Sequence, residues 1–133
     1  MKSRTMLLVL TSVMVAGCAQ IDGDKLRGTY TTSISHQDAP TLPTMAGPWE
    51  ITFGEQGGYS VRRDGLLLIQ GEYSVDGDTL RILKETGVAA CTDQPPAVYS
   101  WKLAADSLTL LHVQETCAGR GVILSAKPLV RKK

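Results

Sequence analysis

Few side chains in this 133-residue sequence belong to types that carry out chemistry near neutral pH. There are three cysteines and two histidines. A histidine can act as a general acid or base, and a thiolate can act as a nucleophile or metal ligand. The sequence contains no Cys-x-x-Cys, Gly-x-Ser-x-Gly, His-Glu-x-x-His, phosphate-binding glycine loop or calcium loop. We therefore predict no catalytic residues, no metal site and no cofactor.

The composition excludes further classes of protein. The chain is 43% hydrophobic and 20% charged, which is typical of one globular domain. Fourteen Lys+Arg against thirteen Asp+Glu give a net charge of +1, so no basic surface points to nucleic acid. Only the N-terminal segment is apolar enough to enter a membrane.

Residues 1–17 have the pattern of an export signal. Lys2 and Arg4 precede an uncharged apolar stretch that is too short to span a bilayer as a permanent helix. The stretch ends in Val15-Ala16-Gly17-Cys18, which resembles the lipobox of bacterial lipoproteins. The resemblance implies cleavage before Cys18 and lipidation of this cysteine. The alternative is a plain secretory peptide with an incidental cysteine.

A lipidated Cys18 would anchor the protein at the cell envelope. Two or three acyl chains make such anchoring effectively permanent, and residues 18–25 would form the lipidated cysteine and a short tether. Ala19, in place of aspartate, resembles the signal for the outer membrane in enteric bacteria. We therefore expect the outer membrane, facing the periplasm, rather than the inner membrane. The mature domain has no polybasic patch, so the lipid alone would hold it there.

Cys91 and Cys117 are the other two thiols. Export would place them where disulfides persist, and an even pair in an exported domain indicates a bridge. By the loop-closure model, this bridge would stabilise the fold by roughly 3.5 kcal/mol. Two cysteines and two scattered histidines do not make a zinc site. We predict a Cys91–Cys117 disulfide.

From residue 26 onward, polar and apolar residues alternate with a period of two. The clearest cases are Trp49-Glu50-Ile51-Thr52-Phe53 and Tyr99-Ser100-Trp101-Lys102-Leu103. Such alternation places one face of a strand on a core and the other in water. Asp-Gly and Gly-Gly pairs supply tight hairpins between the strands. We predict strands near residues 28–35, 48–54, 58–63, 66–75, 79–85, 97–103, 107–114 and 120–130.

Eight strands joined mostly by hairpins predict an all-β, antiparallel, up-and-down barrel, because closure removes both unpaired edges. A two-sheet sandwich is the alternative. No window indicates an amphipathic helix. The expected core is Tyr30, Ile34, Trp49, Ile51, Phe53, Tyr59, Val61, Tyr73, Leu80, Ile82, Tyr99, Trp101, Leu103, Leu108, Leu110 and Ile123.

The order of these parts resembles the lipocalin-like, or calycin-type, barrels over residues 26–131. Leu26-Arg27-Gly28-Thr29-Tyr30 would open the first strand, and Leu129-Val130-Arg131 would form the last. Lipocalins open with Gly-x-Trp, over which a late basic residue packs. Here the aromatic residue is Tyr30, so the match is partial, and the resemblance implies stacking of Arg131 on Tyr30. Gly71-Glu72-Tyr73 before a turn, followed by cysteines in two later loops, also fits such barrels.

The leading functional hypothesis is a lipid-anchored, lipocalin-like barrel that binds a small hydrophobic or amphipathic molecule. The candidate ligand-binding residues are Trp49, Tyr99, Trp101, His112 and Arg120. His112 shares the parity of Leu108 and Leu110, which would turn it inward at the end of its strand; the alternative is a histidine on the rim or a hydrogen-bonded histidine in the core without a role in binding. A mature chain this short predicts a shallow cup or no cavity rather than a roomy calyx.

The alternative function is that of a protein-interaction module. Small envelope barrels with a disulfide also resemble periplasmic lysozyme inhibitors, which work through an exposed loop. Loop 86–96, braced by Cys91, would then bind an exported hydrolase or serve in envelope assembly. A third hypothesis is a purely structural lipoprotein without a specific ligand.

Overall fold

The structure, a computed structural model, describes residues 23–133. The predicted signal sequence and the lipidation of Cys18 lie outside these residues. Residues 23–26 are helical. The elements that follow them are β1 (Gly28–Ile34), η1 (Pro43–Met45), β2 (Gly47–Phe53), η2 (Glu55–Gly57), β3 (Gly58–Arg63), β4 (Leu66–Asp76), β5 (Thr79–Thr86), β6 (Ala97–Ala104), β7 (Ser107–Gln114), α2 (Ala118–Ser125) and β8 (Leu129–Arg131). The first seven strands begin and end within one residue of the predicted positions.

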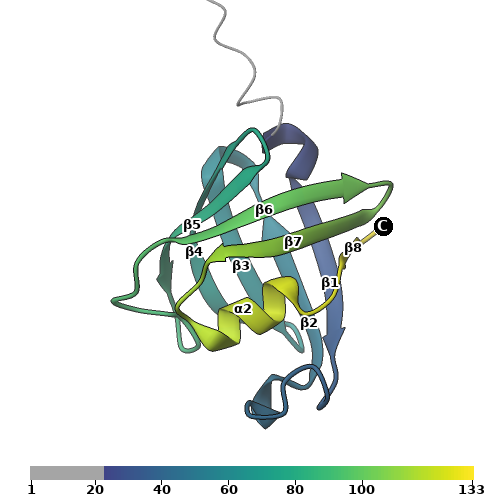
Figure 1. The fold of residues 1–133 in the computed structure, drawn as a ribbon, viewed down its shortest axis with the longest axis vertical. Helices are drawn as coiled ribbons and strands as arrows, with labels where there is room; N and C mark the ends of the chain where they lie inside the picture. The colour runs from purple at the N-terminus through teal and green to yellow at the C-terminus, as the bar shows by residue number, and fades with distance from the viewer. Residues whose placement is uncertain (1–22) are drawn as a thin grey trace, which may run out of the picture.

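The strands form a closed antiparallel barrel in which each strand pairs with the next (Figure 1). The short strand β8 closes it, pairing with β1 at Tyr30↔Arg131 and with β7 at Leu108↔Leu129. The predicted up-and-down barrel is confirmed, and the alternative of a sandwich is excluded because β1 and the C-terminal strand are joined.

The prediction of a strand over residues 120–130 is wrong. Residues 118–125 form the helix α2, and only Leu129–Arg131 is extended. The apolar run Val122-Ile123-Leu124 is too short for its periodicity to distinguish a helix from a buried strand. In the structure Arg120, Ile123 and Leu124 are buried, which is the spacing of one helical face. The helix packs across one end of the barrel against β7 and β1 (Figure 1).

A β-bulge in β5 changes which residues face the barrel interior. Leu80 and Ile82 are buried, and without a bulge the next inward residue would be Lys84. The register shifts so that Ile82 pairs with Tyr73 while Lys84 pairs with Glu72, which leaves Leu83 as the extra residue. Glu85 therefore faces inward, with a buried side chain.

A second bulge does the same in β7. Leu108 and Leu110 are buried, but the pairing shifts between Tyr99↔His112 and Val98↔Gln114, which leaves Val113 as the extra residue. Glu115, just beyond the strand, thus turns its side chain into the barrel. The two bulges bring two glutamates to the same end of the interior.

Hydrophobic side chains fill the barrel. In the described part of the chain, one cluster of buried residues runs from Leu26 to Leu129. Fourteen residues of the predicted core are buried in it, and the other two, Trp101 and Leu103, are partly buried against it. Aromatic contacts centre on Phe53, whose ring lies 5.2 Å from that of Tyr73 and 5.7 Å from that of Tyr59.

The predicted stacking of Arg131 on Tyr30 is confirmed. The guanidinium carbon lies 5.1 Å from the centre of the ring, and its nitrogens donate to the Tyr30 hydroxyl and to the Arg27 carbonyl. The Tyr30 hydroxyl donates in turn to the Leu26 carbonyl. Gly28 makes room, because a Cβ there would lie 2.6 Å from Arg131 Nη1. This contact joins the first strand of the barrel, β1, to the last, β8.

Gly71→Ala is expected to disrupt the bulge between β4 and β5. A Cβ at this position would lie 1.9 Å from the Lys84 carbonyl oxygen, so the backbone must move, at a cost of roughly 3 kcal/mol. Chemical denaturation measures the loss in the free energy of unfolding. The control is Gly77→Asn, at a turn with φ +59° and nothing within 4 Å, which asparagine tolerates. Equal stability of the two variants would contradict the bulge geometry.

Candidate functional site

A network of three buried charged side chains lies at the end of the barrel covered by α2. The Arg120 guanidinium makes a bidentate contact with Glu115, with Nε to Oε2 at 2.9 Å and Nη2 to Oε1 at 2.8 Å. Its Nη1 lies 3.4 Å from Glu85 Oε1. All three side chains are at most 3% exposed. We call Glu85, Glu115 and Arg120 the buried ion network.

The same two carboxylates hold the backbone of the disulfide. Glu85 Oε2 accepts a hydrogen bond from the Cys91 N–H, and Glu115 Oε1 accepts one from the Cys117 N–H, both at 2.9 Å. The predicted Cys91–Cys117 disulfide is present, with 6.1 Å between the Cα atoms. Each half of the bridge is therefore tied to its own glutamate, and Arg120 joins the glutamates.

Hydrogen bonding determines the charge state of Glu115. Burial by itself would raise the pKa of Glu115, but hydrogen bonds from Arg120, Tyr99 and the Cys117 N–H lower it below its ordinary value of 4.5. Burial, together with the Glu115 carboxylate, raises the pKa of Tyr99 far above its usual range, so its hydroxyl stays protonated and donates to Glu115 Oε2. At neutral pH, Glu115 is thus ionised opposite a charged Arg120.

Glu85 is less completely satisfied than Glu115. Its Oε1 atom is buried and accepts no hydrogen bond from any described residue, although it lies in the field of Arg120. The network is almost completely shielded from solvent. Both of its carboxylates accept hydrogen bonds from backbone N–H groups. We assign it the role of holding the connections that leave β5 and β7.

The structure brings three of the predicted ligand-binding residues together. Tyr99 and Arg120 both bond to Glu115. His112 lies beside them, its ring edge-on to that of Tyr99 at 5.6 Å and its Nε2 hydrogen-bonded to the Ser125 hydroxyl of α2. His112 is exposed, so the expectation of an inward-pointing histidine is wrong and the alternative, a histidine on the rim, applies.

The two tryptophans lie elsewhere. Trp49 is buried, donates to the Met45 carbonyl at 2.8 Å, and is covered by the Arg63 guanidinium 4.7 Å from its ring centre. Trp101 donates to the Gly77 carbonyl at 2.9 Å. Both indole N–H groups are thus used within the fold, at connections on opposite ends of the barrel.

Sequence reasoning missed Glu85 and Glu115. Strict alternation from Ile82 and Leu110 places both glutamates outside, and only the two bulges turn them inward. The only available sequence signal was that Glu115 and Arg120 lie close to Cys117, within a six-residue segment. It is too short a pattern to identify an ion pair by itself.

The up-and-down topology separates the connections into two groups. The N-terminal end of the barrel comprises residues 23–27, 54–57, 77–78 and 105–106, whereas the loop end comprises residues 35–46, 64–65, 87–96 and 115–128. The helix α2 lies at the loop end (Figure 1), and the residues of the disulfide and of the buried ion network belong to the same end. A pocket of about 300 Å³ opens beside them, with Cys91, Gln94 and Arg120 in its lining.

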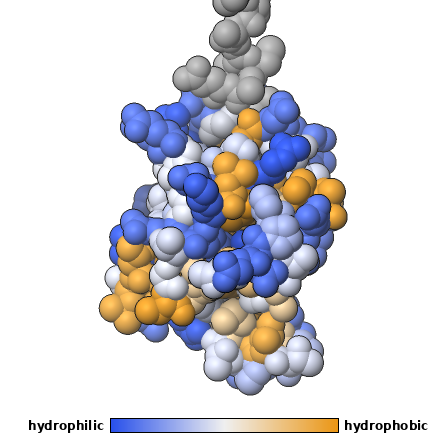
Figure 2. Space-filling model, turned by 90° about the vertical axis from the view of Figure 1, so that its left-hand side faces the viewer, coloured by the Kyte–Doolittle hydropathy of each residue, from blue (hydrophilic) through white to orange (hydrophobic). Residues whose placement is uncertain are grey.

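Exposed apolar side chains adjoin the same loop. Val88 is 89% exposed and Leu66 is 66% exposed, with Leu67 also exposed. The two segments lie side by side, because the Ala89 N–H donates to the Leu68 carbonyl at 3.2 Å. We call Leu66, Leu67 and Val88 the loop-end patch. Figure 2 shows that hydrophobic side chains reach the surface in separate groups among hydrophilic ones.

Comparisons with protein-family models, with curated proteins and with solved structures found no match. Within residues 23–133, no three His, Cys, Asp or Glu side chains are grouped so that they could hold a metal ion. No helix in that part of the chain has the length and apolar character to cross a membrane.

Arg120→Met is expected to lower the free energy of unfolding by about 3–5 kcal/mol, because two buried carboxylates lose their cation. Denaturant unfolding monitored by tryptophan fluorescence measures this loss. The control is Arg62→Met on the exposed side of β3, where the change is expected to be nearly neutral. A loss below about 1 kcal/mol for Arg120→Met would show that the network contributes little.

Proposed function

We propose that this protein is a lipid-anchored lipoprotein of the cell envelope that acts as a protein-interaction module through loop 86–96. The observation that carries the proposal is the loop-end patch: an exposed valine on a loop that the disulfide and the buried ion network hold in place, beside two exposed leucines at the start of β4. Exposed apolar groups on a rigid support are typical of protein–protein contacts.

The anchor is supported by the sequence and by the direction of the chain. The lipobox-like Val15-Ala16-Gly17-Cys18 ends five residues before Gly23, which enters the N-terminal end of the barrel. A lipid on Cys18 would hold that end toward the membrane. The loop end would then face away from the bilayer, toward proteins of the periplasm if the anchor lies in the outer membrane.

Rigidity supports loop 86–96 as the binding surface. The Cys91 N–H is fixed on Glu85, the Ala89 N–H on Leu68, and the Gln94 side chain accepts a hydrogen bond from Thr116 at 2.7 Å. A loop that is ordered before binding loses little conformational entropy in a complex. Such a loop suits recognition of one partner better than a flexible segment does.

The filled interior weighs against a ligand inside the barrel. The rings of Trp49 and Tyr99 are packed in the core and their polar atoms are already paired. The pockets of about 280–430 Å³ lie at the barrel ends and along its wall. A small amphipathic molecule therefore has to bind outside the core.

Replacing Cys18 by alanine is expected to abolish metabolic labelling of the protein with an alkyne fatty acid and to release it from the membrane fraction. Labelling that survives Cys18→Ala, or a wild-type chain that takes up no label, would contradict the anchor. The Cys91→Ser variant serves as the control, because Cys91 is held in the disulfide and its loss is expected to leave labelling intact.

A photo-crosslinking amino acid at position 88, in the full-length protein in cells, is expected to give one discrete adduct with an envelope protein. Position 130 is the matched control, since Val130 is an exposed valine on β8. The adduct should disappear when Leu66→Asp disrupts the loop-end patch. Equal adducts at both positions, no adduct at position 88, or an adduct with a second copy of this chain would contradict the proposal.

A further inference from the structure

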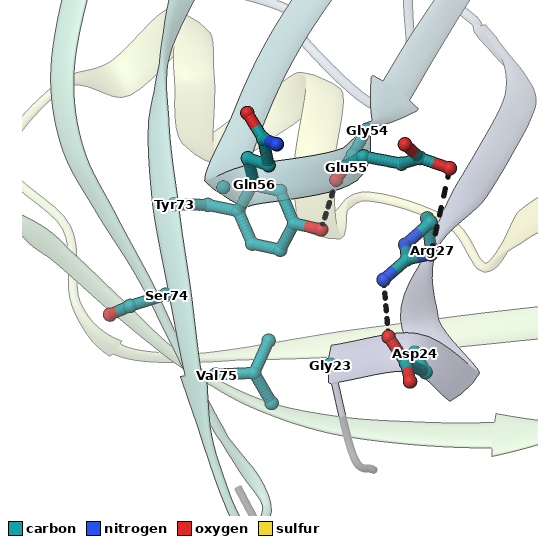
Figure 3. A pocket seen from close by; sticks show the side chains of 10 residues that line it. Gly23, Asp24, Arg27, Gly54, Glu55, Gln56, Tyr73, Ser74 and Val75 are labelled. Atoms are coloured by element: carbon teal, nitrogen blue, oxygen red, sulfur yellow. Dashed lines mark hydrogen bonds and ion pairs between the residues drawn. The ribbon is translucent and has the colours of Figure 1, made fainter. Parts of the chain in front are cut away.

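The largest of the four pockets described lies at the N-terminal end of the barrel, where the proposed function assigns no role. It has a volume of about 430 Å³ and is formed by residues 23–27, the turn at 54–57 and residues 73–75 of β4. This volume is within the range of small-molecule sites. Figure 3 shows Arg27 on one side of the pocket, facing Tyr73 and Val75 on the other.

The polar side of the pocket carries one cation between two anions. Arg27 pairs with Asp24 through Nη2, and its Nη1 lies 3.8 Å from Glu55 Oε1 (Figure 3). Arg27 is 40% exposed, and both carboxylates are more exposed still. Because these three side chains are already partly solvated, they can replace their present ion-pair partners by the charged groups of a ligand at a small desolvation cost.

The opposite side offers apolar surface. The Tyr73 hydroxyl donates to the Gly54 carbonyl at 2.7 Å, which fixes its ring at the pocket wall, and Val75 follows on the same strand. A ligand that fits both sides has charged groups of both signs at one end and apolar atoms next to them.

The chain direction brings this pocket close to the bilayer. Cys18 and Gly23 are five residues apart, which spans at most about 18 Å at about 3.6 Å per residue. An anchor on Cys18 would thus hold the pocket within reach of phospholipid headgroups. This step rests on the anchor in the proposed function.

We propose that this pocket binds the headgroup of a zwitterionic phospholipid with a primary ammonium group. Arg27 binds the phosphate, the carboxylates of Asp24 and Glu55 accept hydrogen bonds from the ammonium group, and the glycerol region contacts Tyr73 and Val75. An anionic headgroup without an amine would instead meet two carboxylates and a single guanidinium. A trimethylammonium group cannot donate hydrogen bonds to either carboxylate.

Vesicle flotation tests the site with a leaderless chain, residues 19–133, in which the barrel between residues 28 and 131 is complete. The vesicles are phosphatidylcholine alone, or mixed with phosphatidylethanolamine or with phosphatidylglycerol. Binding to the vesicles that contain phosphatidylethanolamine is expected to be at least about tenfold tighter than binding to either of the other two compositions, a difference of ~1.4 kcal/mol. Equal binding to all three compositions, or no binding to the ethanolamine vesicles, overturns the proposal.

Arg27→Gln is expected to abolish this preference while leaving the unfolding temperature within a few degrees of the wild type. Arg62→Gln, on the exposed side of β3, is the matched control and should bind like the wild type. If Arg27→Gln binds the phosphatidylethanolamine vesicles as tightly as the wild type does, the assignment of Arg27 to the phosphate is overturned. If the protein binds soluble phosphoethanolamine but not the vesicles, the proposal that the pocket binds a membrane lipid is overturned. Because the leaderless chain lacks Cys18, failure here is distinct from failure of the fatty-acid labelling that tests the anchor.

Discussion

The arrangement of the loop end depends on Arg120 and the two carboxylates that it joins. Removing three charged side chains from water costs several kcal/mol per ion. The cost is offset here by the bidentate contact with Glu115, by the Tyr99 hydroxyl and by two backbone N–H donors. Those donors belong to Cys91 and Cys117. The network therefore stabilises one position of the disulfide relative to the barrel, where a bridge alone would fix only the distance between its two ends.

Two bulges make this network possible, and they also mark the limit of what the sequence could predict. Alternation, turn residues and the even cysteine pair predicted the closed barrel, seven strand positions and the disulfide, because these features depend on local patterns. The pairing of Arg131 with Tyr30 followed from a family resemblance. Leu83 and Val113 are ordinary strand residues in sequence, and nothing local identifies them as the extra residues that turn Glu85 and Glu115 inward. The helix α2 was missed because its apolar run is as short as a strand.

The barrel presents two different ends on a filled core. A closed up-and-down barrel is compatible with ligand binding, but here aromatic and aliphatic side chains occupy the interior, which leaves recognition to the surface. The loop end combines the disulfide, the buried ion network and the loop-end patch. The N-terminal end combines the start of the barrel with a polar pocket. Anchoring at Cys18 would give these ends separate tasks, one facing lipid and the other facing protein.

Amide hydrogen exchange, measured by NMR on the oxidised protein, tests most directly whether the buried ion network holds the loop. The Cys91 and Cys117 amides donate to buried carboxylates, so they should exchange as slowly as amides in β5 and β7, about a thousandfold or more below the rate of an unstructured peptide. The amide of Val88, an exposed residue of the same loop, provides the internal comparison. Cysteine amides that exchange as fast as that of Val88 would contradict the account.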